Sequence, residues 1–156
     1  MAWTPDLTVA AVVEREGKFL LVEESVSDAL VINQPAGHVE PGESLLEAVV
    51  RETKEESAWL FQPQALVGVY LWGDPGGPTF LRVAFCGGCR DHDPTQALDD
   101  GIVRTLWLTR EQILAKEDHL RSPMVQRCID DYLAGDRFSL DTLKYLGEVS
   151  TRVAMG

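Results

Sequence analysis

The sequence predicts an α+β domain in which a mixed β-sheet lies between helices. Three observations support this: apolar β-branched runs recur along the chain, glycine- and proline-rich turns separate neighbouring runs, and amphipathic segments begin at capping residues. With 156 residues the chain is long enough to bury a sizeable core, so we expect one domain spanning 1–156. From about residue 137 the pattern weakens, and we expect this tail to pack loosely.

The first half begins with two strand-like runs. Residues 7–14 and 18–23 are apolar and β-branched, and a short polar turn separates them, which favours a hairpin. A shorter apolar run follows at 29–32. Proline and glycine in 33–37 then favour a loop or bulge.

A helix is expected after this loop. Ser44 and Glu47 have the S-x-x-E spacing of a capping box, in which the serine accepts from an otherwise unpaired backbone amide. Apolar residues from Leu45 to Val50 supply a buried side, and the helix should run to about Ser57.

The second half contains further strands and two helices. A strong turn signal at 74–78 separates two strand-like runs, and a serine–proline pair begins an amphipathic helix. The expected elements are strands at 65–72, 79–86 and 102–108, a short helix opening at Thr109, and a helix from Ser122 that ends near Gly135.

Composition narrows the classes of function. The formal net charge of −11 disfavours nucleic acid and anionic membrane surfaces as partners. The N-terminus lacks a signal-like segment, and no window is apolar enough to span a bilayer. Three cysteines are too few for a disulfide framework, so we expect a soluble cytoplasmic protein, a monomer or a homodimer.

Crowded carboxylates on the first helix are the strongest chemical signal. At 100° per residue, Glu55 lies about 60° to one side of Glu52 and Glu56 lies about 40° to the other, so the three share one wedge. With no base expected on that side, the wedge suits a hard divalent cation, magnesium or manganese. Arg51 is expected to point away from the wedge and to pair with Glu43 before the helix.

Gly37 adds a second type of ligand. Without a Cβ it lets the backbone approach closely, so its carbonyl would join the carboxylates around the cation. Sites of this kind usually hold phosphate oxygens, and the ion then neutralises charge and activates a water. The alternative is that a glutamate-rich helix is only a solvated face.

The spacing of these residues resembles the signature of the Nudix hydrolases. Gly37 is followed after five residues by Glu43, then after seven by Arg51 and Glu52, and after two more by Glu55 and Glu56, with apolar Trp59 behind them. Two positions depart from the signature: Thr53 replaces an aliphatic residue and Ala58 replaces a glycine. Neither is a carboxylate, although Ala58 would cost about 1 kcal/mol if that position needs a positive φ.

The resemblance implies an α/β/α sandwich and magnesium-dependent attack of water on a nucleoside diphosphate linked to another group. By position, Glu52, Glu55 and Glu56 would hold the metal together with the Gly37 carbonyl. Glu43 and Arg51 would form a structural ion pair, and one of the glutamates or a later acid would be the general base. Asp99 or Asp100 would supply a further acid, or be a solvated loop pair.

Further segments are similar to the phosphatase NudJ subgroup of this family. They are 8–10, 17–20, 22–24, 33–38 and 120–123, together with Tyr132 and Gly135. The subgroup implies phosphate release from nucleoside tri- and diphosphates and from the thiamine precursor hydroxymethylpyrimidine pyrophosphate. Two alternatives stay open: a nucleotide-pool enzyme that releases pyrophosphate, and a silent domain that binds a nucleotide as a sensor.

Several residues outside the signature are candidates for substrate contact. Arg82 would meet a phosphate or base, and Tyr70, Trp72 and Phe80 would stack on a heterocycle, with core packing as the alternative for each. Arg121 beside a helix N-terminus would hold an anion, or would simply accompany the cap.

Other polar residues have weaker functional signals. His38 is expected to be a polar loop residue near the site. Cys86, Cys89, His92 and Cys128 suggest zinc or redox chemistry, but the second pair of zinc ligands is missing and residues 87–94 read as a loop. We therefore expect no zinc or redox function for these four residues.

Overall fold

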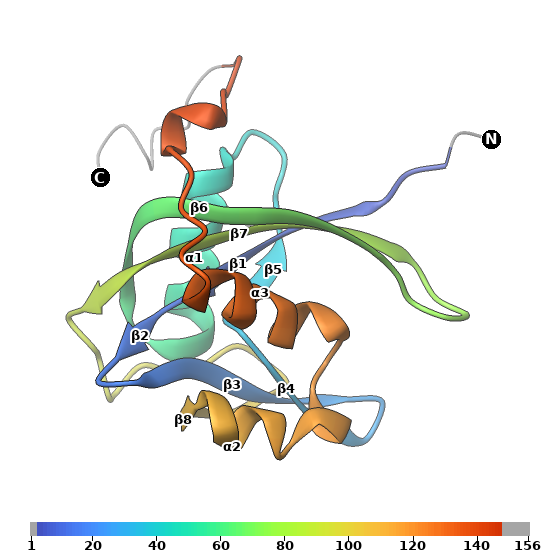
Figure 1. Ribbon diagram of the computed structural model, residues 1–156, viewed down its shortest axis with the longest axis vertical. Coiled ribbons are helices and arrows are strands. Elements are labelled where there is room, and N and C mark those ends of the chain that lie inside the picture. Colours follow the sequence, from blue (N-terminus) through green and yellow to red (C-terminus); the bar gives the residue numbers. More distant parts are fainter. Residues whose placement is uncertain (1–2, 148–156) are drawn as a thin grey trace.

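The computed structural model describes residues 3–147, which form two four-stranded sheets with helices packed against them (Figure 1). The expected α+β class is confirmed. In chain order the elements are β1 (Asp6–Val12), β2 (Glu14–Arg15), β3 (Lys18–Val26), β4 (Ala29–Asn33), β5 (Ala36–His38), α1 (Leu45–Ser57), β6 (Leu60–Gly73), β7 (Thr79–Arg90), β8 (Ile102–Thr109), α2 (Arg110–Leu114) and α3 (Pro123–Leu133), with 3-10 turns at Glu117–His119 and Leu140–Thr142.

The first sheet is mixed and has the strand order β5-β1-β7-β6. Strands β1 and β7 run parallel, with Val9 beside Val83, whereas β1–β5 and β6–β7 are antiparallel. In the second sheet β3 pairs antiparallel with β2, β4 and β8. The central strand β1 is buried on both faces, as expected for a strand covered by helices on either side.

Two apolar clusters cover the two faces of the first sheet. Val9 and Phe85 belong to the cluster beneath α1, and Val12 and Ala84 belong to the cluster beneath α3. Neighbouring residues of a strand point to opposite faces, so β1 and β7 contribute to both clusters. Figure 1 shows α1 and α3 on opposite sides of this sheet, which gives the α/β/α sandwich.

Helix α1 begins and ends as its sequence predicts. Ser44 Oγ accepts from the backbone N–H of Glu47, and the Glu47 carboxylate accepts from the backbone N–H of Ser44, which completes the capping box. The helix ends at Ser57, and Ala58 follows in the left-handed region with φ of 62°. This position therefore does adopt a positive φ, with alanine in place of the glycine of the signature.

The predicted hairpin between residues 7–14 and 18–23 is wrong for most of its length. Only Glu14 and Arg15 pair with β3, because β5 and β7 occupy both edges of β1. The loop predicted at 33–37 contains part of a strand, since β5 begins at Ala36. The loop predicted at 87–94 is also wrong for its first part, which includes Cys89, because strand β7 continues past Cys86 to Arg90 beside β6.

Part of the segment after Arg137 is held against the sheet. Phe138 and Leu66 exchange two backbone hydrogen bonds of 2.8 Å, and Leu140 and Leu143 pack against the cluster beneath α1. The remainder of the predicted tail, 148–156, lies outside the described residues. Among residues 3–147, no helix has the length and apolar character needed to cross a membrane.

Candidate active site

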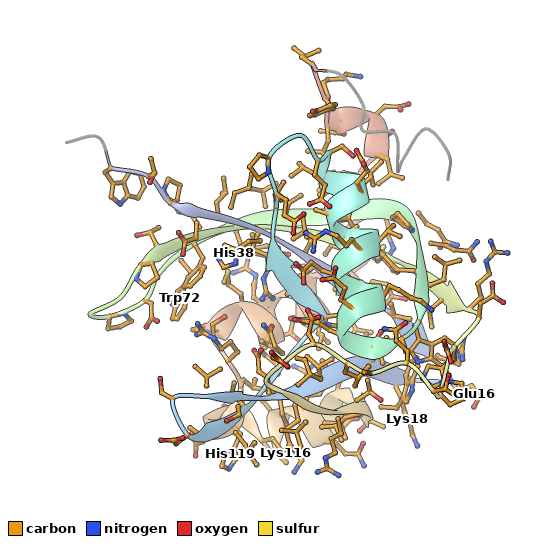
Figure 2. The ribbon with its side chains drawn as sticks, turned by 180° about the vertical axis from the view of Figure 1, so that it is seen from behind. Glu16, Lys18, His38, Trp72, Lys116 and His119 are labelled. Atoms are coloured by element: carbon orange, nitrogen blue, oxygen red, sulfur yellow. The ribbon has the colours of Figure 1, made fainter. Side chains whose placement is uncertain are left out.

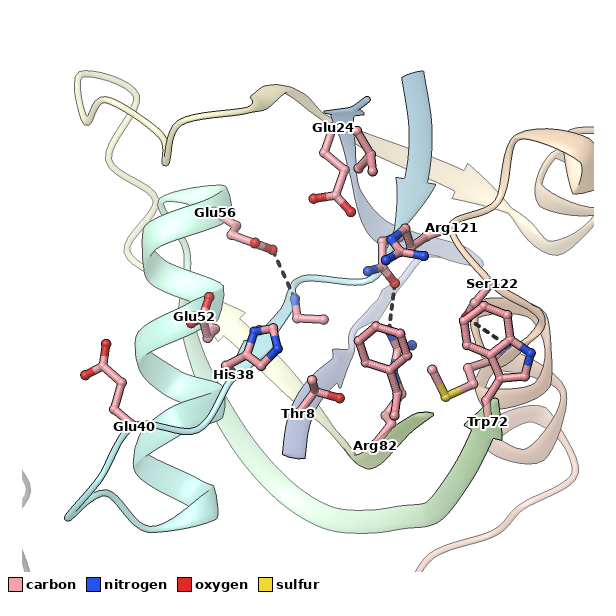
Figure 3. A pocket seen from close by; sticks show the side chains of 16 residues that line it. Thr8, Glu24, His38, Glu40, Glu52, Glu56, Trp72, Arg82, Arg121 and Ser122 are labelled. Carbon is pink, nitrogen blue, oxygen red and sulfur yellow. Dashed lines mark hydrogen bonds between the residues drawn. The ribbon is translucent and has the colours of Figure 1, made fainter. Parts of the chain in front are cut away.

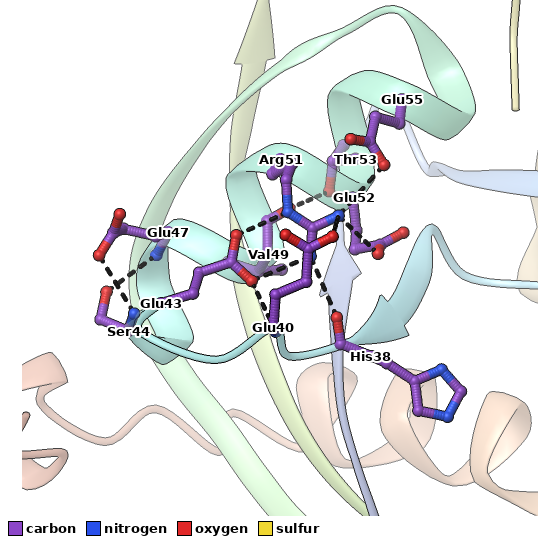
Figure 4. A network of polar contacts seen from close by, with 10 residues as sticks. All are labelled: His38, Glu40, Glu43, Ser44, Glu47, Val49, Arg51, Glu52, Thr53 and Glu55. Carbon is purple, nitrogen blue, oxygen red and sulfur yellow. Dashed lines mark hydrogen bonds and ion pairs between the residues drawn. The ribbon is translucent and has the colours of Figure 1, made fainter. Parts of the chain in front are cut away.

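Arg51 joins helix α1 to the loop that precedes it. Its guanidinium forms two bonds with the Glu43 carboxylate, Nε to Oε2 at 2.6 Å and Nη2 to Oε1 at 2.9 Å, and Nη2 also donates to the carbonyl of His38 at 3.0 Å (Figure 4). The predicted ion pair is therefore present. Because Glu43 also accepts from the backbone N–H of Glu40, the pair fixes the loop between β5 and α1.

The expectation that Arg51 points away from the other acids is wrong. Its Nη1 lies 2.8 Å from a carboxylate oxygen of Glu52 and 3.1 Å from one of Glu55. The long side chain reaches sideways along the helix surface, so a position on the helical wheel does not fix the guanidinium. Arginine thus offsets part of the repulsion in the wedge, and the surrounding carboxylates raise the Arg51 pKa above its usual value.

Three carboxylates from two segments meet at one point. Glu52, Glu56 and Asp99 each offer an oxygen, and these oxygens all lie within 4.8 Å of one another. Asp99 is brought there by its backbone N–H, which donates to the carbonyl of Glu55 at 3.0 Å. Neither Glu55 nor Asp100 is part of this group among the described residues.

Glu56 is the most buried member of the group, with 9% of its surface exposed. Burial is the main reason that its pKa rises to about 8, although the backbone N–H of Ala36 donates to it at 3.0 Å and opposes the rise. The pKa of Glu52 is also raised, mainly by burial, against the effect of Arg51. A buried carboxyl with neighbouring acids and no basic partner of its own favours a bound cation.

Gly37 lies against the Glu52 carboxylate. A Cβ built at this position would overlap the carboxyl group of Glu52, so a glycine is required for the strand to pass this close. The oxygen-only donor set and the close backbone approach fit magnesium or manganese, both of which prefer carboxylate and carbonyl oxygens.

The acids form one wall of a cavity of about 420 Å³. Figure 3 shows Glu52 and Glu56 on α1 at one side, Trp72 and Ser122 at the other, and Thr8 and Arg82 between them. In the view of Figure 2, His38 and Trp72 lie on the same side of the molecule, whereas Glu16 and Lys18 lie on the other. The cavity thus combines an acidic wall with an aromatic wall.

Residues 4–128, which include both walls of this cavity, match the NUDIX domain family. The chain belongs to the Nudix family. Phosphatase NudJ of Shigella boydii serotype 4 is 42% identical over 139 residues, 89% of this chain and 90% of the relative, and that of Escherichia coli K12 is 41% identical with the same coverage. A solved Nudix hydrolase from Nitrosomonas europaea is 47% identical with a TM-score of 0.89, covering 92% of this chain and 98% of the other. These similarities identify the chain as a Nudix hydrolase similar to phosphatase NudJ.

Four of the five candidate substrate residues line the cavity of this Nudix hydrolase: Arg82, Trp72, Phe80 and Arg121. Trp72 and Phe80 are stacked, with ring centroids 5.9 Å apart and an interplanar angle of 15°, and the Arg121 guanidinium lies 5.6 Å from the Phe80 ring. Tyr70 is not brought to this cavity. Its hydroxyl donates to Asp131 on α3, which covers this part of β6.

Several other residues line the cavity that were not among the predicted site residues, namely Thr8, Glu24, Asn33 and Met124. They come from β1, β3, β4 and α3, so only the pairing of distant segments brings them together. In the sequence, Thr8, Glu24 and Asn33 lie within the segments that are similar to phosphatase NudJ, whereas Met124 lies outside them.

His38 and the cysteines lie outside the group formed by Glu52, Glu56 and Asp99. His38 lines the cavity edge, is largely exposed and lies 3.6 Å from a carboxylate oxygen of Asp6. Cys86 and Cys89 belong to different apolar clusters, so their side chains are on opposite faces of β7. No group of three metal-binding side chains within residues 3–147 includes a cysteine.

Proposed function

We propose that this Nudix hydrolase is a magnesium-dependent phosphohydrolase, with manganese as a substitute, that cleaves phosphate anhydrides of small molecules. The observation that carries the proposal is the meeting of Glu52, Glu56 and Asp99 oxygens within 4.8 Å at the wall of a ligand-sized cavity. We place the protein in the cytoplasm, with neither nucleic acid nor membrane as a partner.

In this proposal the metal ligands are Glu52, Glu56 and Asp99, with Glu55 and the Gly37 carbonyl completing the site. When bound, magnesium would neutralise charge on the phosphate oxygens and lower the pKa of an attacking water. The Glu55 side chain is 41% exposed, and its Oε2 accepts from Arg51. Among residues 3–147 no hydrogen bond to its Oε1 is found, so this oxygen is available to the ion or its waters. Asp100 has no role here.

The remaining residues would position the site and the substrate. Arg51 holds Glu52 and Glu55 at fixed places and ties them to Glu43 on the loop. Trp72 and Phe80 offer aromatic surface for the organic part of the substrate, and Arg121 supplies a positive charge to a cavity rich in acids. Preorganisation of this kind is expected to provide much of the rate acceleration.

The proposed substrates are nucleoside tri- and diphosphates and hydroxymethylpyrimidine pyrophosphate, with phosphate as the product. The similarity to phosphatase NudJ over 89% of the chain supports this choice. Release of pyrophosphate from nucleoside triphosphates is the second candidate, because the acidic wall by itself does not select which anhydride bond is attacked. A silent nucleotide sensor is disfavoured, since all four signature acids and the arginine are present.

Product analysis tests the proposal. Purified protein is incubated with each substrate in excess magnesium, and phosphate and pyrophosphate are separated by ion chromatography. Phosphate alone supports the proposal, pyrophosphate supports the second candidate, and nucleotide binding without product would show a sensor. Glu56→Gln is the matched control, because it removes the central carboxylate charge with little change in shape.

A further inference from the structure

We propose that Arg82 is a positioning residue that fixes the Asn33 amide as a hydrogen-bond donor toward the substrate. The enzyme should then prefer anhydrides whose planar ring presents a carbonyl oxygen to this amide over those that present an amino group there. This inference rests on the proposed function of the same cavity and names its substrate class more narrowly.

Arg82 is buried on β7, with 3% of its surface exposed. Its Nη1 donates to Gln34 Oε1 at 2.7 Å, and its Nη2 donates to Asn33 Oδ1 at 2.9 Å. A guanidinium has donors only, so both neighbouring amides must turn their oxygens toward it. The orientation of each amide group is therefore determined by Arg82.

The two amides differ in what their nitrogens do. Gln34 is 1% exposed, and its Nε2 donates to the backbone carbonyl of Val125 on α3 at 2.8 Å. The Gln34 amide therefore bonds to other protein groups and not to a ligand. Asn33 lines the cavity, and its Nδ2 has no acceptor among residues 3–147. Asn33 is thus a donor of fixed orientation whose acceptor has to come from a ligand.

The charge around Arg82 favours the same kind of ligand atom. Within residues 3–147 its guanidinium has no carboxylate partner, and its buried Nε has no hydrogen-bond acceptor. A buried positive charge with two neutral amide partners is only partly compensated. In the part of the cavity next to Arg82, which we call the cavity floor, its field stabilises a ligand atom with partial negative charge and destabilises an amino group.

The neighbouring aromatic pair indicates what carries that atom. Trp72 and Phe80 are stacked at the same cavity. Figure 3 shows Arg82 between Trp72 and the acids of α1. A flat ring packed against this pair has its edge near the cavity floor, while its phosphates extend toward Glu52 and Glu56. The Asn33 amide would then donate its hydrogen bond to the edge of the ring and not to the phosphates.

Uracil and cytosine nucleotides test the inference, because uracil presents a carbonyl oxygen at the ring position where cytosine presents an amino group. The neighbouring N3 carries a proton in uracil and none in cytosine. Wild-type protein should hydrolyse UDP over CDP with a kcat/KM ratio of about 10, mainly through KM, since the contact is remote from the reacting phosphorus. GDP should be preferred over ADP for the same reason.

Asn33→Asp is the decisive variant. One carboxylate oxygen keeps the bond to Arg82 and the other replaces the amide nitrogen with an acceptor, so the UDP:CDP ratio should fall below one. Arg82→Met should bring the ratio close to one by freeing the Asn33 amide, and Arg82→Lys should restore part of it. Arg104→Met, which changes an exposed arginine on β8, should leave the ratio unchanged.

Calorimetric binding of UMP and CMP to the same variants separates the two proposals. Absence of any hydrolysis product would overturn the proposed function, whereas the UMP:CMP affinity ratio decides the inference without turnover. Ratios that stay within twofold of the wild-type value in Asn33→Asp, with thermal unfolding showing a folded protein, would overturn the inference. Reversal in Asn33→Asp supports it even where Arg82→Met fails to fold.

Discussion

Arg51 and Glu43 form a bidentate ion pair, with Nε–Oε2 and Nη2–Oε1 distances of 2.6 Å and 2.9 Å. Only 3% of the Glu43 side chain and 14% of the Arg51 side chain are exposed. The same Arg51 guanidinium also contacts Glu52 and Glu55. Arg51 thus belongs both to the ion pair with Glu43 and to the group of acids on α1. A change in the position of the loop before α1 would therefore move Arg51 and, through it, the acids of the proposed metal site.

Arg51→Ala should lower the free energy of unfolding by about 3 kcal/mol, because it leaves the buried Glu43 carboxylate without its partner. Arg51→Lys should recover only part of this loss, since an ammonium group cannot form the two parallel bonds. Urea unfolding of the metal-free protein measures both values. Arg127→Ala is the matched control: the Arg127 side chain is 70% exposed where it pairs with Asp131, so a much smaller loss of stability is expected.

Gly37→Ala should reduce divalent-ion affinity and turnover by at least about tenfold, the usual scale for disturbing the support of a metal ligand. The new Cβ would overlap the Glu52 carboxyl group and force it away from Glu56 and Asp99. Manganese binding followed by calorimetry gives the affinity. Gly88→Ala is a suitable control, because a Cβ there meets no atom within 4 Å; equal effects of the two changes would contradict the argument.

Much of the fold could be predicted because its signals are local. The capping box of Ser44 and Glu47 fixed the start of α1, and the serine–proline pair at 122–123 fixed the start of α3. The partners of β1 could not be predicted, because β5 and β7 reach it from 24 or more residues away in the sequence. The hairpin prediction failed for this reason.

The candidate site shows the same difference between local signals and contacts of distant segments. Spacing on a single helix was enough to bring Glu52 and Glu56 together, and the loop acid Asp99 needed the family resemblance. The reach of Arg51 toward Glu52 depends on side-chain conformation, which a helical wheel does not contain. Asn33 and Arg82 are 49 residues apart and meet only through tertiary packing, so their pairing has no signal in a single sequence.

Asp99→Asn and Asp100→Asn form a matched pair of neighbouring substitutions. Asp99 contributes an oxygen to the group with Glu52 and Glu56, and Asp100 does not. Asp99→Asn should weaken manganese binding by about 10-fold or more, through loss of one ligand charge, and Asp100→Asn should leave it within about twofold. Calorimetric titration of both variants decides between them, and a larger effect at Asp100 would reject the assignment of Asp99.

The stability of the metal-free protein should fall as pH rises from 5 to 9. Burial raises the pKa of Glu56 to about 8, above the value of about 4.3 for glutamate in an unfolded chain. The folded protein therefore keeps a proton that the unfolded chain has already lost. The stabilisation is complete below the unfolded pKa and is lost as pH rises through the folded one, with a slope approaching about 1.4 kcal/mol per pH unit.

Glu56→Gln should flatten this pH dependence, because the amide has no proton to lose. Magnesium should reverse the wild-type trend, since the ion binds ionised Glu56 and its stabilisation grows as the carboxyl deprotonates. Urea unfolding at about pH 5.5, 7 and 8.5, with chelator or with saturating magnesium, measures each slope. If wild-type protein and Glu56→Gln gave the same slope in chelator, Glu56 would not be the titrating group, and the burial argument for its metal role would fail.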